Sequence, residues 1–173
     1  MQRAGFYCLV LIGALCTPVL ALPGQTTAQF AAWGKANAAL RGFHASIDDE
    51  TGGTNYMATV VEQGYHGEYN AEPQRGRVHM EYISFQDMPD AWHLEFHLPF
   101  VIATIRDVYG EAIAADFTRA RRIPHVGRVA AWQGKKLAYA TFGTALFIVD
   151  TPEFANLVEN MHVCDAIVCD DDD

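Results

Sequence analysis

The chain has 173 residues, of which 50% are hydrophobic and only 19% are charged. These values are typical of one folded domain with a buried core, and they argue against intrinsic disorder. Asp and Glu outnumber Lys and Arg by 21 to 12, and the formal net charge of -9 excludes general nucleic-acid binding, because phosphate binding needs a surplus of cations.

The first 21 residues have the pattern of a secretory signal peptide. Arg3 gives a basic start, an apolar stretch follows from Ala4 to Cys16, and small residues precede a cleavage site after Ala21. We therefore expect an exported protein, either periplasmic or secreted. Processing as a lipoprotein would use Cys16 instead, but the bulky Leu15 before it fits that reaction poorly. After residue 21, no apolar stretch reaches the roughly 20 residues of a membrane-spanning helix.

The next part of the chain predicts one helix followed by several strands. Phe30, Trp33 and Leu40 recur at helical spacing within residues 26–42, between Thr27 as a cap and Gly42 as a stop. After this helix, polar and apolar residues alternate and turn residues separate the segments. We predict strands at 43–47, 55–62, 65–70, 77–85 and 92–98.

The second half predicts another group of helices and strands. Residues 100–121 favour a helix that Gly110 divides, followed by a hairpin with strands at 129–132 and 137–142 and by a strand at 145–149. Thr151 and Pro152 indicate the start of a last helix that runs to about residue 162. No linker of biased composition divides the chain. We therefore expect a single α+β domain at 22–169, an antiparallel meander sheet with helices packed on one face, and an acidic tail at 170–173.

A His-x-Glu unit recurs in three of the predicted strands. The units are His66 and Glu68, His79 and Glu81, and His93 and Glu95, with His97 after the third unit. Residues two apart share one face of a strand, so each unit would lie on the polar face of the sheet. If Asn70 paired with Arg77, His66 would face Glu81, and a second hairpin would set His79 against Glu95.

This array has three interpretations. A solvent-facing polar ladder would stabilise the sheet and do nothing else. A site for zinc or copper would use the imidazole and carboxylate groups as ligands. A pH sensor would need each His to be partly buried beside a carboxylate. The candidate metal ligands are His66, His79, Glu81, His93, Glu95 and His97.

Basic residues gather where acidic residues are missing. No Asp or Glu occurs from residue 117 to residue 149, and Lys135 and Lys136 lie in this stretch. The segment predicts an edge that binds an anion or an acidic partner, although its cations would equally neutralise the acidic tail or form a solvated helix end. The candidate residues are Arg119, Arg121, Arg122 and Arg128.

The cysteines that would remain after cleavage are Cys164 and Cys169. In an oxidising compartment, their short spacing predicts a local disulfide bond. A metal site formed by these cysteines and His162 is the alternative, but it lacks the second ligand pair of common zinc sites.

The sequence contains neither a phosphate-binding glycine loop nor a Gly-x-Ser-x-Gly motif, so nucleophilic catalysis has poor support. We expect a small exported binding protein without catalytic activity or cofactor, which engages a protein or a small ligand. An inhibitor or immunity protein of a secreted enzyme would fit this size and compartment. The alternative is a metal-binding protein or metal-dependent hydrolase that uses the His/Glu array.

Overall fold

The computed structural model describes residues 22–47, 52–89, 91–126, 129–150 and 154. Several predictions fall outside these residues: the signal peptide, Arg128, the last helix apart from Phe154, the Cys164–Cys169 disulfide and the acidic tail.

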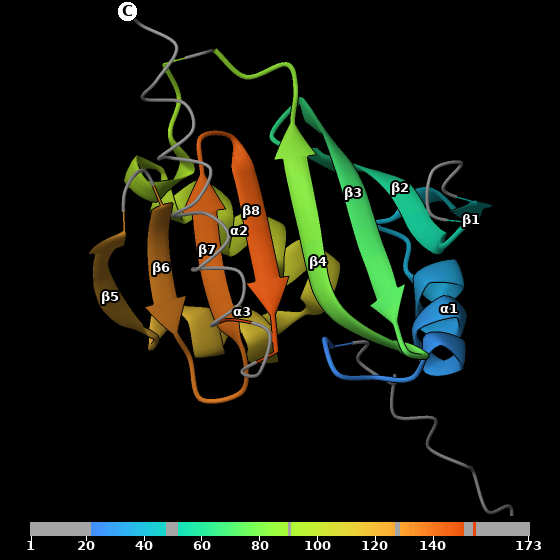
Figure 1. Cartoon of the computed structure of the whole chain (residues 1–173). Coiled ribbons are helices and arrows are strands. Elements are labelled where there is room, and N and C mark those ends of the chain that lie inside the picture. The colour runs from blue at the N-terminus through green and yellow to red at the C-terminus, as the bar shows by residue number, and fades with distance from the viewer. Residues whose placement is uncertain (1–21, 48–51, 90, 127–128, 151–153, 155–173) are drawn as a thin grey trace, which may run out of the picture.

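One antiparallel sheet forms the centre of the described chain, with its strands in the order β1-β2-β3-β4-β8-β7-β6-β5 (Figure 1). Two meanders meet where β4 pairs with β8. The helices α2 and α3, which connect the meanders, lie against one face of the sheet (Figure 1). The predicted α+β class, an antiparallel meander sheet with helices packed on it, is confirmed. The elements are α1 (Thr27–Ala36), β1 (Arg41–Ile47), β2 (Thr54–Glu62), β3 (Tyr65–Gln74), β4 (Arg77–Phe85), the 3-10 helix η1 (Leu94–Phe96), α2 (Leu98–Tyr109), α3 (Glu111–Thr118), β5 (Arg121–Val126), β6 (Val129–Gln133), β7 (Ala138–Phe142) and β8 (Ala145–Val149).

The first helix is shorter than its apolar pattern predicts. Thr26 is the N-cap and forms a capping box with Gln29, and the helix ends at Ala36. Gly34 allows the ring of Phe43 to approach, because a Cβ atom at this position would lie only 2.2 Å from that ring. Phe43 lies in β1, and the buried ring of Phe30 packs against the ring of Phe43.

The two helices behind the sheet follow the sequence pattern closely. α2 ends where the prediction placed a break, at Gly110, whose φ of 84° favours glycine. α3 then begins at Glu111. Their apolar residues, among them Val101, Ile105 and Ile113, are fully buried against the sheet.

The predicted strand at 92–98 is wrong. Residues Leu94–Phe96 form η1, and α2 begins at Leu98 with Pro99 in its first turn, where a missing N–H costs nothing. Leu94 is fully buried, and its N–H donates to the carbonyl oxygen of Gly143. β4 therefore pairs with β8 rather than with this segment.

The predicted register between β3 and β4 is also wrong. Asn70 pairs with Tyr82, not with Arg77, and Ala71 rather than His66 faces Glu81. Arg75 and Gly76 form a tight turn with φ values of 50° and 78°, so β3 continues through Pro73 to Gln74. An irregularity between Glu72 and Pro73 shifts the register once more. As a result, Glu81 is buried instead of facing solvent.

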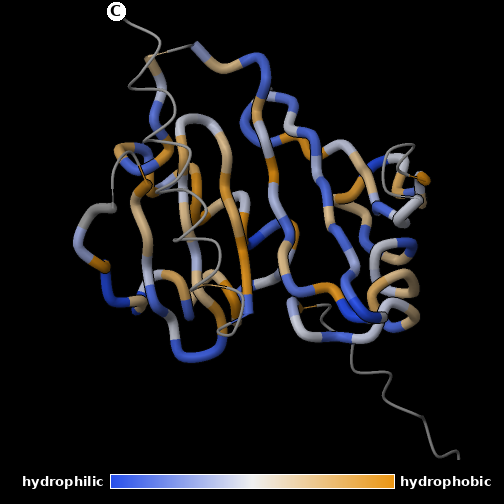
Figure 2. The backbone as a smooth tube through the Cα atoms, in the orientation of Figure 1, coloured by the Kyte–Doolittle hydropathy of each residue, from blue (hydrophilic) through white to orange (hydrophobic). Residues whose placement is uncertain are grey.

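The sheet is apolar on both faces only in its second half. Figure 2 shows that β8 is hydrophobic along its length, whereas β3 is largely hydrophilic. The main core lies between the sheet and the helices. A smaller cluster on the β4–β8 half contains Val129, Ala131, Ala138, Ala140, Val149 and Phe154. Within the described residues, no helix is long and apolar enough to cross a membrane.

Candidate functional site

The structure distributes the predicted His/Glu array over separate places. Glu81 lies in the core, His79 near the end of β8, and His93, Glu95 and His97 around η1. His66 and Glu68 lie on the face of the sheet opposite α2 and α3, which we call the open face. Among the described residues, no group of three or more His, Cys, Asp or Glu side chains is placed to hold a metal ion. Metal binding stays a prediction.

Glu81 is fully buried between β4 and the helices. Its Oε2 accepts a hydrogen bond of 2.7 Å from the hydroxyl of Tyr69. Burial raises the pKa of Glu81 to about 7, although hydrogen bonding to Tyr69 and Tyr109 lowers it in part. The carboxyl group therefore keeps its proton up to near neutral pH inside the core.

His79 is partly buried and has a carboxylate partner. Its Nδ1 lies 2.6 Å from Oδ2 of Asp150, whose side chain is 14% exposed. The backbone of Asp150 also donates to the carbonyl oxygen of His79. These two contacts, one between side chains and one between backbones, join the start of β4 to the residue that follows β8.

His93, Glu95 and His97, the candidate ligands around η1, contact aromatic or basic groups. The ring of His97 stacks on Trp92 with 4.0 Å between centroids, and His93 lies edge-on to Phe96. The carboxylate of Glu95 accepts a hydrogen bond of 3.0 Å from Arg122.

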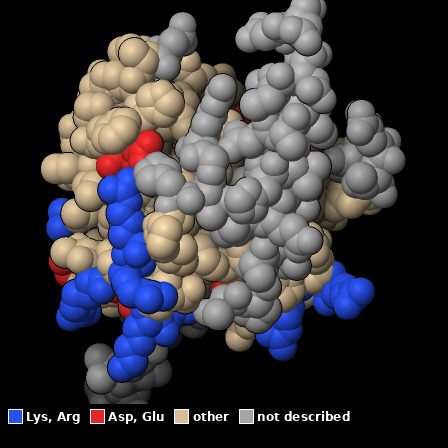
Figure 3. Space-filling model, turned by 60° about the vertical axis from the view of Figure 1, so that its left-hand side comes forward, with Lys and Arg blue, Asp and Glu red and all other residues tan. Residues whose placement is uncertain are grey.

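The predicted basic residues that the structure describes gather at one edge of the sheet. Arg121 and Arg122 lie in β5, which is the last strand on that side, and Arg119 follows α3. All three are exposed, as are Lys135 and Lys136 in the turn between β6 and β7. Figure 3 shows Lys and Arg side chains in a band on this side of the molecule.

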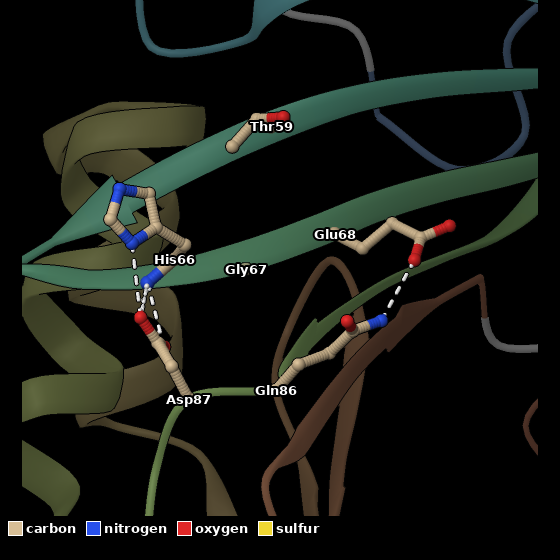
Figure 4. A pocket seen from close by; sticks show the side chains of 6 residues that line it. All are labelled: Thr59, His66, Gly67, Glu68, Gln86 and Asp87. Atoms are coloured by element: carbon tan, nitrogen blue, oxygen red, sulfur yellow. Dashed lines mark hydrogen bonds and ion pairs between the residues drawn. The ribbon is translucent and has the colours of Figure 1, made fainter.

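A polar groove lies on the open face, at the end of the sheet where β3 begins and β4 ends. In β3 the buried residues Gly67, Tyr69 and Ala71 point to the core, so His66 and Glu68 point the other way. The hollow has a volume of about 490 Å³ (Figure 4). Its lining residues are Thr59, His66, Gly67, Glu68, Gln86 and Asp87.

Asp87 fixes His66 at one end of this groove. Its carboxylate accepts from the backbone N–H of His66 at 2.9 and 3.1 Å, and Oδ2 lies 3.0 Å from Nδ1 of the ring. These hydrogen bonds hold the pKa of Asp87 below its ordinary value. An ionised carboxylate selects the tautomer with a proton on Nδ1, so Nε2 is free to accept. Figure 4 shows this second nitrogen pointing away from Asp87.

Glu68 forms the other end of the groove. One carboxylate oxygen accepts from the side-chain amide of Gln86 at 3.0 Å, and the other accepts from Asn70 at 3.2 Å. Both oxygens are thus held in place, yet each retains a lone pair for a further donor.

The sequence pattern singled out His66 and Glu68 but not the residues that complete the groove. Thr59, Gln86 and Asp87 come from β2 and from the turn after β4, and no motif connects them with His66. An Asp in a predicted turn was the one available signal, and it is typical of turns in general. Comparison with known proteins adds no further site, since no protein family, no curated protein and no solved structure matches the chain.

Proposed function

We propose that this protein is a non-catalytic binding protein that holds a small polar ligand in the groove on the open face. The observation that carries the proposal is that the carboxylate of Asp87 forms hydrogen bonds with both the backbone N–H and the ring of His66. This arrangement presents Nε2 as an acceptor beside a hollow large enough for a small molecule. Export through the predicted signal peptide belongs to the same proposal.

The lining of the groove favours a ligand that is rich in hydrogen-bond donors. Glu68 and Asp87 are acceptors, His66 offers Nε2, and Thr59 has a hydroxyl that both donates and accepts. No Lys or Arg is among the described residues that line the hollow. A diamine or a polyol would satisfy these acceptors, whereas an anion would meet two carboxylates without a compensating cation.

The proposal is tested by NMR titration of the His66 ring signals with putrescine as a diamine and inositol as a polyol. We expect at least one probe to shift these signals in a saturable manner. Asp87→Asn should weaken that binding by about tenfold, because the amide cannot accept both hydrogen bonds while fixing the same tautomer. His44→Gln serves as the matched control, since His44 is an exposed histidine on β1.

Two results would contradict the proposal. If neither probe shifts the His66 signals, or if Asp87→Asn binds as the wild type does, the groove is not a site for donor-rich ligands. If stoichiometric zinc or copper binds instead and His66→Gln abolishes it, the metal-binding alternative replaces the proposal. Thermal unfolding of each variant shows whether it has kept its fold.

A further inference from the structure

A second surface of the molecule has the opposite charge from the groove. It consists of Arg119, Arg121, Arg122, Lys135 and Lys136, and we call it the basic edge. The two arginines of β5 lie beside the end of β6, because Arg121 pairs with Gln133 and Arg122 with Trp132. The lysines follow Gly134 in the turn after β6, so cations from the end of α3, from β5 and from this turn lie at one end of the sheet (Figure 3).

A buried carboxylate holds the turn that carries the two lysines. Asp116 of α3 is 7% exposed, and its oxygens accept from the backbone N–H groups of Lys135 at 3.1 Å and Lys136 at 3.3 Å. The hydroxyl of Tyr139 donates to the same carboxylate. Gly134 leaves room for it, because a Cβ atom there would lie 2.3 Å from Oδ2 of Asp116. The backbone is thus fixed while both lysine side chains remain exposed.

Arg122 is held in a different way. Its guanidinium donates to Glu95 at 3.0 Å and lies 5.8 Å from the centre of the Trp132 ring. This contact orders one end of the basic edge. By contrast, none of the ion pairs formed between described residues involves Arg119, Arg121, Lys135 or Lys136. These four cations lie near one end of the β5–β6 pair, on a chain whose formal net charge is -9.

The same edge offers main-chain hydrogen-bonding groups. β5 pairs with β6 on one side and has no described strand on its other side. Pro124 lacks an N–H and limits pairing in the second half of β5. The first half, Arg121–Ile123, contains no proline, and it is also the half that carries the arginines.

We propose that the basic edge binds an extended, acidic segment of a partner protein, which pairs with the first half of β5. Main-chain hydrogen bonds would supply strand pairing, and the cations would select acidic side chains. A protein segment fits better than a nucleic acid, because the cations cover one end of a single edge and the rest of the chain carries an acidic surplus that repels a long polyanion.

The test uses a fluorescent peptide of four Glu-Val repeats and measures its anisotropy at low and moderate salt. We expect saturable binding that weakens with salt. The double variant Arg121→Glu with Lys135→Glu should bind at least about tenfold more weakly. The double variant Lys35→Glu with Arg41→Glu makes the same change in charge at exposed sites outside this surface, and it should bind within about twofold of the wild type. Circular dichroism checks that both variants are folded.

Three further experiments test whether the ligand of the basic edge pairs as a strand, whether it is a protein segment, and whether it belongs to another chain. A peptide of the same charge with N-methylated Val residues should lose most binding, and equal binding would overturn strand pairing. Single-stranded DNA of equal charge that binds more tightly than the peptide would overturn the choice of a protein partner. If only a chain without residues 170–173 binds the peptide, the protein's own acidic tail is the occupant and an external partner is ruled out. Absence of binding in every form would overturn the proposal as a whole.

Discussion

Glu81 shows how the environment of one side chain can make the stability of the fold depend on pH. Its carboxyl group is fully buried, and burial is the main reason why its pKa rises from the ordinary value of 4.5 to about 7. The hydroxyl groups of Tyr69 and Tyr109 are its polar neighbours, and the pKa of each tyrosine is raised well above 10.0 by burial and by Glu81. A neutral carboxyl group is therefore the form that suits the core.

Glu81→Gln should remove a pH-dependent loss of stability. Between about pH 4.5 and 7 the folded protein keeps a proton that the unfolded chain releases, so the free energy of unfolding falls as the pH rises through this window. The loss is complete above pH 7 and amounts to roughly 3 kcal/mol. Relative to the wild type, the Gln variant should gain roughly 2–3 kcal/mol between pH 5 and pH 8 in urea unfolding experiments.

Glu62→Gln provides a comparison for this experiment. The pKa of Glu62 is raised by burial and by the charge of Asp107, so its effect has the same sign, but the group lies at the end of β2 rather than in the centre of the core. If the free energy of unfolding of the wild type and of Glu81→Gln changed with pH in the same way, Glu81 would be ionised in the folded protein at neutral pH, contrary to the prediction.

The sequence pattern singled out Glu81 but assigned it to the wrong face. Alternation within β4 predicted that Glu81 shares a face with His79, but it could not show which face would be buried or that the ladder is irregular at His79. That choice depends on the register with β3, where Glu81 lies opposite the buried Ala71. A polar residue at the centre of a core is an exception to hydrophobic patterning, so the pattern itself points away from it.

At the scale of elements, the turn between β3 and β4 determines that register. Arg75 and Gly76 both have positive φ values, 50° and 78°, which is the geometry of a two-residue type I′ turn. The sequence pattern predicted that the strand ends at residue 70 and that the next begins at residue 77, because Pro and Gly close together usually mark a loop. Pro73 instead lies within β3 at the irregularity in the ladder.

Substitutions in this turn should change stability in opposite directions. Gly76→Ala should lower the free energy of unfolding by about 1 kcal/mol, because a Cβ atom is strained at this φ even though no atom lies within 4 Å of it. Arg75→Asn should raise it by a few tenths of a kcal/mol, since Asn tolerates positive φ better than Arg. Thermal unfolding measures both changes. Equal stability of Gly76→Ala and the wild type would show that the turn does not require left-handed residues.

The sequence predicted most elements correctly, and the exceptions have physical reasons. α2, α3 and the hairpin of β6 and β7 follow from periodicity and from Gly110 and Gly134. β5 was missed, because its two arginines and Pro124 are poor strand formers and an edge strand needs only one partner. The segment from Trp92 to Leu98 alternates as a strand does, but burial of Leu94 against the end of β7 determines its conformation.

At the scale of the whole molecule, the last strand of each meander pairs with the other. The pairing of β4 with β8 joins residues more than 60 positions apart, with α2, α3 and three strands between them. Local patterns carry no information about such a contact. The groove depends on the same long-range order, since Asp87 comes from the turn after β4 and His66 from the start of β3. The sequence could therefore identify two residues of the groove, His66 and Glu68, but not the site.

The pairing of β4 with β8 should make both meanders unfold together. Ile83 of β4 pairs with Leu146 of β8, both are 1% exposed, and both belong to the core that also contains residues of the helices. Ile83→Ala should therefore lower the free energy of unfolding by about 2–5 kcal/mol in both halves of the sheet. Two single-tryptophan forms, one keeping Trp33 in α1 and one keeping Trp132 in β6, report on the halves separately in urea.

Both reporters should show one transition with the same midpoint, and Ile83→Ala should shift the two midpoints equally, because one core spans the β4–β8 pair. Ile47→Ala is the matched control: this side chain is 64% exposed at the end of β1, so removing the same atoms should cost less than about 0.5 kcal/mol. If the Trp33 form and the Trp132 form unfold at different urea concentrations, the meanders are separate cooperative units. The groove of the first meander and the basic edge of the second would then be energetically independent, whereas a shared transition means that a ligand bound to either one stabilises both.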